Sequence, residues 1–155
     1  WFIVALFINI GTIDDLAKWS YQSPEKLSWY LEQRTEYMER DSWDIDVELL
    51  IKEKKFDCKG YSAVFLTVLN KWGVKWEQKI LTVRAPFKAH AVCVFWYKNQ
   101  YCYFGGSGGI VYTGTTNIYN VPSMVYENWI SWKLYEDAKA TVILEKGEVV
   151  IESYK

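Results

Sequence analysis

Cys58 and His90 are the residues of this chain whose types and positions suggest catalysis. Cys58 precedes a long apolar run, and His90, the only histidine, opens a second one that extends to residue 95. A cysteine thiolate is a nucleophile, and imidazole exchanges protons near neutral pH. The pair therefore predicts a cysteine nucleophile with its general base. The alternative is a cysteine buried for packing and a histidine unrelated to it.

The residues around Cys58 predict that it opens a helix. Asp57 is of the type that caps a helix N-terminus, and Gly73 is of the type that ends a helix. The partial positive charge of a helix N-terminus and a nearby imidazolium would each lower the thiol pKa. The first N–H groups of the helix would face an oxyanion, and His90 would take a proton and return it to the leaving group.

The rest of the pattern places this helix between a helical first half and a β-rich second half. Start signals for three helices occur at Thr12, at Ser23-Pro24 with a helical period toward residue 38, and at Ser42 or Asp44 with an end near Lys54. Strands are expected at 74–83, 90–97 and 100–104, a helix at 121–137, and a closing hairpin from 141–145 and 148–152. Helices first and strands later predict an α+β fold, and the length favours one domain, 1–155.

Composition excludes several classes of function. The 18 basic residues nearly balance the 19 acidic ones, so we expect no nucleic-acid partner. Three cysteines are an odd number, which favours reduced thiols, and we expect Cys93 and Cys102 to pack inside strands. With a single histidine, we predict no metal site. The glycine cluster 105–109 lacks the lysine of a phosphate-binding loop, and no cofactor is predicted.

The segment Trp1–Ile10 is almost wholly apolar but too short to span a bilayer as a helix. We expect it to form a buried first strand or helix, and the alternative is the remnant of a signal or anchor. A membrane partner is expected only if an anchor precedes Trp1, and the cytoplasm is otherwise the favoured location. The sequence predicts no oligomeric state.

Three blocks of the sequence carry a family resemblance. They are the cysteine block 57–63, the end of its helix at 69–74, and the histidine block 90–95. With the lead-in segments 23–25 and 41–44, they make residues 20–106 resemble the transglutaminase-like superfamily of papain-like thiol enzymes, especially its small bacterial and phage members. The resemblance implies a papain-like core, in which N-terminal helices and a central cysteine-bearing helix pack on an antiparallel sheet.

The resemblance also implies an activity. Cys58 would be acylated by a peptide or protein amide, or by an ester, with His90 as base and acid and the Cys58 N–H at the oxyanion. The acyl group would then pass to water or to an amine, as in a cysteine peptidase or transglutaminase. In the family an Asp or Asn after the next strand completes the site. Here that place falls near Gly105 or Gly106, and no carboxylate or amide side chain occurs between residues 101 and 116.

The missing third group keeps a second hypothesis open. A catalytically inactive module of the same fold would bind a protein or glycan partner. The nine Trp and twelve Tyr residues would then include interface anchors, since aromatic residues are enriched at binding hot spots. Ordinary core packing is the other explanation for these aromatic residues. Five of the tryptophans lie at element ends or on predicted helices: Trp19, Trp29, Trp43, Trp129 and Trp132.

Overall fold

The computed structural model describes residues 8–41, 44–85, 88–130, 138–144 and 147–154. One six-stranded sheet, with the strand order β6-β5-β4-β3-β7-β8, forms its centre. All of its strand pairs are antiparallel. Its strands are β3 (Gln78–Ala85), β4 (Lys88–Tyr97), β5 (Gln100–Phe104), β6 (Val111–Tyr112), β7 (Ala138–Leu144) and β8 (Gly147–Tyr154).

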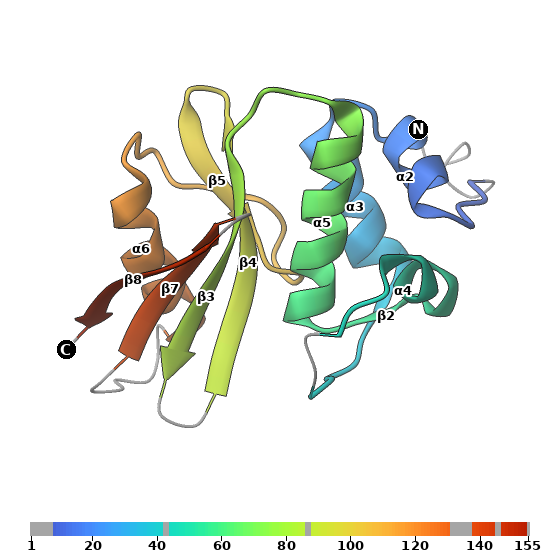
Figure 1. Cartoon of the computed structure of the whole chain (residues 1–155). Helices are drawn as coiled ribbons and strands as arrows, with labels where there is room; N and C mark the ends of the chain where they lie inside the picture. Colours follow the sequence, from blue (N-terminus) through green and yellow to red (C-terminus); the bar gives the residue numbers. More distant parts are fainter. Residues whose placement is uncertain (1–7, 42–43, 86–87, 131–137, 145–146, 155) are drawn as a thin grey trace.

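Helices cover both faces of this sheet. Helix α6 (Val121–Ile130) lies on one face and α5 (Cys58–Trp72) on the other, with three shorter helices beyond α5 (Figure 1). These are α2 (Ile13–Trp19), α3 (Pro24–Arg34) and α4 (Val47–Glu53). The predicted α+β class and the antiparallel sheet are confirmed. Among the described residues no helix has the length and apolar character needed to cross a membrane.

Helix α5 forms where the sequence predicts it. The Asp57 side chain accepts the N–H of Gly60 at 2.8 Å, and Gly73 ends the helix in the left-handed region at φ 67°. The face toward the sheet is apolar, and the Phe65 ring lies 4.7 Å from that of Phe104 and 5.2 Å from that of Phe95. Burying a side chain of this size stabilises the fold by about 2–3 kcal/mol, so α5 is held chiefly by packing.

Two helix boundaries differ from the prediction. Helix α3 starts at its predicted cap, Ser23, but ends at Arg34 instead of continuing toward residue 38. There the chain becomes extended and forms β1 (Glu36–Tyr37), which pairs in parallel with β2 (Lys55–Phe56). This long-range pairing overrides the local helical period. The cap of α4 is Asp46, which accepts the Leu49 N–H at 3.1 Å, and not Ser42 or Asp44.

The β-rich half follows the prediction with shifted ends. Strand β3 begins at Gln78 instead of residue 74, and β6 and the 3-10 turn Ile118–Asn120 were not predicted. Lys98 and Asn99 form the expected tight turn, both with positive φ. Helix α6 is described to Ile130, and the rest of the predicted helix, 131–137, lies outside the described residues, as do 1–7 of the opening apolar segment.

The core consists of two clusters separated by the sheet. One joins α5 and the outer helices to strand residues that include Cys93, Phe95 and Phe104. The other joins α6 to residues of the opposite sheet face, among them Val92 and Val94. Successive strand residues point to opposite faces, so each strand contributes alternately to the two clusters.

Candidate active site

Cys58 is the first residue of α5 and is 8% exposed. The backbone N–H of Ala91 in β4 lies close enough to its sulfur to favour the thiolate. Strand β5 pairs with β4 only as far as the Cys93–Phe104 pair, so β4 has a free side beyond that point. N–H groups along a strand point alternately to its two sides. The N–H of Ala91 points away from Thr82, its partner in β3, and toward the side of β4 that β5 leaves free. The first residue of α5 therefore lies near the side of β4 that β5 leaves unpaired.

The thiol of Cys58 is less acidic than an ordinary thiol. Burial is the largest influence and raises its pKa, and the negative charge of Asp57 raises it further. The Ala91 N–H and the positive charge of Lys59 act in the lowering direction without reversing the shift. The sequence predicted a lowered thiol pKa from the helix N-terminus, and that prediction is wrong in direction because desolvation of the thiolate outweighs the favourable dipole.

His90 lies in β4, opposite Val83 of β3, and its side chain is half-buried. Its ring packs against Gly105, where a Cβ atom would lie 2.9 Å from Nε2 and 2.8 Å from Cγ1 of Val92. Alternation along β4 thus gives His90 the sheet face of Val92, which is the face that α6 covers, whereas α5 packs on the opposite face. The thiol lies near the edge of the strand at Ala91. The structure brings Cys58 and the residue after His90 together at one end of β4. The catalytic pairing of thiol and imidazole remains a prediction.

At Gly105 and Gly106, where the family resemblance predicts a third catalytic group, neighbouring side chains leave little room for a side chain. A Cβ atom at Gly105 would overlap the His90 ring, and one at Gly106 would lie 2.6 Å from Cδ2 of Tyr61. Gly106 also has φ 111°, a conformation that side-chain-bearing residues rarely adopt. The sequence located the gap at Gly105 or Gly106, and the structure explains why no larger residue stands there without a shift of its neighbours.

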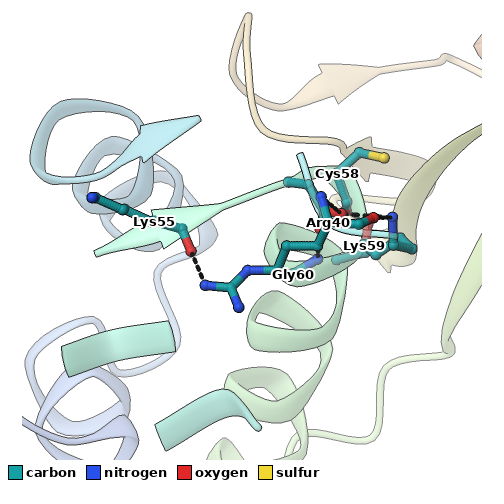
Figure 2. A network of polar contacts seen from close by, with 7 residues as sticks. Arg40, Lys55, Cys58, Lys59 and Gly60 are labelled. Carbon is teal, nitrogen blue, oxygen red and sulfur yellow. Dashed lines mark hydrogen bonds and ion pairs between the residues drawn. The ribbon is translucent and has the colours of Figure 1, made fainter. Parts of the chain in front are cut away.

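A buried ionic network fixes the start of α5 (Figure 2). Asp57 is 2% exposed and accepts the N–H groups of Gly60 and Arg40, at 2.8 and 3.3 Å. Its third partner is the Lys59 ammonium at 2.6 Å, which also donates to the Arg40 carbonyl at 2.6 Å. Cys58 points away from the Arg40 guanidinium, which binds Glu53 and the Lys55 carbonyl. The network therefore orients the helix end and leaves the sulfur directed toward the sheet.

A cleft of about 440 Å³ opens next to this helix end. Tyr37 belongs to its lining, and the partial burial of its hydroxyl, together with the charge of a Cys58 thiolate, raises the pKa of Tyr37 to about 12. The cleft is lined by Glu32, Gln33, Thr35, Tyr37, Tyr61 and the loop residues 106–109. The sequence did not single out Glu32 or Tyr37, because they reach the site through the long-range β1–β2 pairing, which leaves no local signal.

The structure also describes the other cysteines and some of the tryptophans that the sequence singled out. All three cysteines are free thiols, and Cys93 and Cys102 are fully buried in strands, as predicted. Within the described part of the chain no group of three or more His, Cys, Asp or Glu residues could hold a metal ion. Of the proposed aromatic anchors, Trp29 is 37% exposed, whereas Trp43, Trp132 and the side chain of Trp129 lie outside the described residues.

Comparisons of this chain with protein-family models, with curated proteins and with solved structures give no match.

Proposed function

We propose that this protein is a thiol-dependent amide hydrolase or acyl transferase that uses Cys58 as nucleophile and His90 as general base. The observation that carries the proposal is the proximity of the Cys58 sulfur to the backbone N–H of Ala91, which acts against the rise of the thiol pKa. It brings a thiol from the first turn of α5 to the strand position next to the only histidine.

The proposed reaction begins with acylation. The Cys58 sulfur attacks the amide carbonyl carbon while His90 takes the thiol proton, and the carbonyl oxygen gains the negative charge. Backbone N–H groups at the start of α5 stabilise that oxyanion. The carbon–nitrogen bond then breaks, and His90 returns its proton to the departing amine. Water or a second amine attacks the thioester, gives a proton to His90, and releases the acyl product as the thiol re-forms.

The raised thiol pKa determines how this reaction would run. Burial keeps the resting Cys58 protonated at neutral pH, so little thiolate is present before substrate binds. The proton must then leave as the sulfur attacks, which is the task of a general base. We therefore expect catalysis to depend on His90 more strongly than in an enzyme with a preformed thiolate.

We also propose a papain-like core for this fold. Its support is the arrangement of a cysteine-bearing helix packed on an antiparallel sheet, with the histidine strand beside it and the next strand ending at Gly105. These are the features that the transglutaminase-like resemblance implies. The order of the cysteine, the histidine and the third position along the chain is also the order of that family.

The second candidate is a catalytically inactive module that binds a protein or glycan partner. It is favoured by Gly105, because an orienting carboxylate or amide would have to stand against the His90 ring and the glycine has no side chain to supply one. Loss of such an orienting group lowers the rate of related triads by about 10⁴-fold. The cleft beside Tyr37 would then serve binding alone.

Acylation by an activated ester separates the two candidates. We expect p-nitrophenyl acetate to add one acetyl group that peptide mass mapping places on Cys58, and we expect none on that residue in Cys58→Ala. Cys102→Ala removes a different buried thiol and is the matched control that should acylate normally. His90→Gln should slow acylation by about 10²–10⁴-fold, the usual contribution of a general base. A folded protein that is not acylated at Cys58, or a His90→Gln variant that reacts at the same rate, would refute the enzymatic proposal.

A further inference from the structure

The cleft beside the thiol contains a single charged side chain. Among the described residues that line it, Glu32 alone carries a charge, and the others are Gln, Thr, Tyr, Ser and Gly. Glu32 lies on the last turns of α3, whose end at Arg34 leads directly into β1. A lone carboxylate in a partly enclosed cleft gives the site a negative potential.

The Glu32 carboxylate lacks hydrogen-bond partners for part of its buried surface. Its Oε1 atom is excluded from solvent and finds no hydrogen-bond partner among the described residues. The N–H of Gly109 interacts with the carboxylate, but burial is the larger influence and raises the pKa of Glu32. A buried acceptor without a partner costs about 1–3 kcal/mol, and more when it is charged. A cation in the cleft would offset this cost through the charge of the carboxylate, since Oε1 itself is closed to solvent.

The tyrosine side chains give the cleft a rigid wall and an open aromatic ring. The Tyr61 ring stacks on Phe56 at 5.0 Å with an interplanar angle of 14°, and its hydroxyl lies 2.8 Å from Oγ1 of Thr35. Gly106 closes the other side of this ring. Tyr37, by contrast, is 61% exposed. A carboxylate together with an exposed aromatic ring is the combination that recognises a cation carrying N–H donors.

We propose that this cleft binds a cationic side chain, a guanidinium or an ammonium, of the peptide whose amide reaches Cys58. That the ligand is a substrate peptide rests on the proposed function. Binding of the cation itself does not require the thiol. The cation is a recognition element that does not react. It would neutralise the Glu32 carboxylate, donate hydrogen bonds to it and lie against Tyr37, with the neighbouring peptide bond directed toward the N-terminus of α5.

The test uses small peptide analogues and the Cys58→Ala variant, so that binding is measured without chemistry. N-acetyl-arginine amide, N-acetyl-lysine amide and the neutral N-acetyl-citrulline amide are titrated while the amide signals of Gly106, Gly108 and Gly109 are followed by NMR. We expect at least one cationic analogue to bind about 10-fold or more tightly than citrulline, with shifts at these glycines. The arginine and lysine titrations identify which cation is preferred.

Matched variants tie the binding to the cleft. Glu32→Gln should reduce the affinity for the cation to that for citrulline, and Tyr37→Leu should weaken it independently. Glu39→Gln, which removes an exposed carboxylate that does not line the cleft, should bind normally. Equal binding of all three analogues, no binding of any of them, or unchanged cation binding in a folded Glu32→Gln protein would overturn the inference. Because the thiol is absent from these measurements, they fail or succeed separately from the acylation experiment.

Discussion

Replacing Asp57 by asparagine isolates the charge of the residue that precedes the thiol. Asn keeps a side-chain oxygen for the Gly60 N–H and caps helices about as well as Asp. The substitution therefore leaves the cap but removes the ion pair with Lys59 and the acceptor of the 3.3 Å hydrogen bond from the Arg40 N–H, because both use the other carboxylate oxygen. The Lys59 side chain is only 18% exposed, and its ammonium would retain the Arg40 carbonyl as a hydrogen-bond acceptor.

The expected cost follows from this geometry. Breaking a fully buried ion pair from one side costs about 3–5 kcal/mol, because the remaining charge stays desolvated. Partial exposure of Lys59 and its remaining acceptor reduce the value, and we expect Asp57→Asn to lower the free energy of unfolding by about 2–3 kcal/mol. Asp57→Ala should cost about 1 kcal/mol more through loss of the cap. Adding Lys59→Met to Asp57→Asn should restore most of the stability, since no buried charge then remains.

Urea unfolding of the four proteins measures these values, with the same m-value expected for each. Asp46→Asn is the matched control, because Asp46 caps α4 without a buried ionic partner in the described contacts and should change stability by less than about 0.5 kcal/mol. If Asp57→Asn costs no more than Asp46→Asn, or if Lys59→Met gives no recovery, the ion pair does not stabilise the start of α5 as argued.

Three further predictions concern the site. Gly105→Ala should lower the free energy of unfolding by about 1–3 kcal/mol, measured with urea, and slow ester acylation, because its Cβ would overlap the His90 ring. In the control Gly11→Ala the Cβ meets no atom closer than 3.8 Å, so its stability should be near that of the wild-type protein. Equal effects of the two substitutions would contradict the packing argument. The pH midpoint for iodoacetamide alkylation of Cys58 should lie above that of glutathione, since burial raises its pKa, and a midpoint below it would show that the thiolate is stabilised instead. Burial raises the pKa of Glu32 in the folded state, so the folded protein binds a proton more tightly than the unfolded chain, and stability falls as pH rises from the unfolded pKa through the folded pKa. Glu32→Gln should remove this fall and should be more stable than the wild-type protein only above that pH window. A gain in stability that persists at pH 3 would refute this prediction.

The sequence predicted best the features that local chemistry determines. Asp57 and Gly73 fixed both ends of α5, the Thr12 and Ser23 caps fixed two helix starts, and Lys98-Asn99 fixed the hairpin turn. Capping side chains, left-handed glycines and tight turns act over three or four residues, so the type of residue is enough to locate them.

Long-range contacts account for what the sequence did not predict. The end of α3 depends on the pairing of Glu36 and Tyr37 with a segment nearly twenty residues away, and the helical period through Met38 gave no sign of it. The thiol pKa depends on how deeply the packing of α5 against the sheet buries Cys58, which residue types alone do not determine. The cleft around Glu32 required α3, β1 and the 106–109 loop to be placed together.

The proximity of the Ala91 N–H to the Cys58 sulfur makes one backbone amide a natural reporter of the thiol. Oxidation, alkylation or acylation of the sulfur changes its charge and size, and the proton of that amide must respond. A single resolved cross-peak would then follow modification of the Cys58 sulfur, without any label attached to the protein.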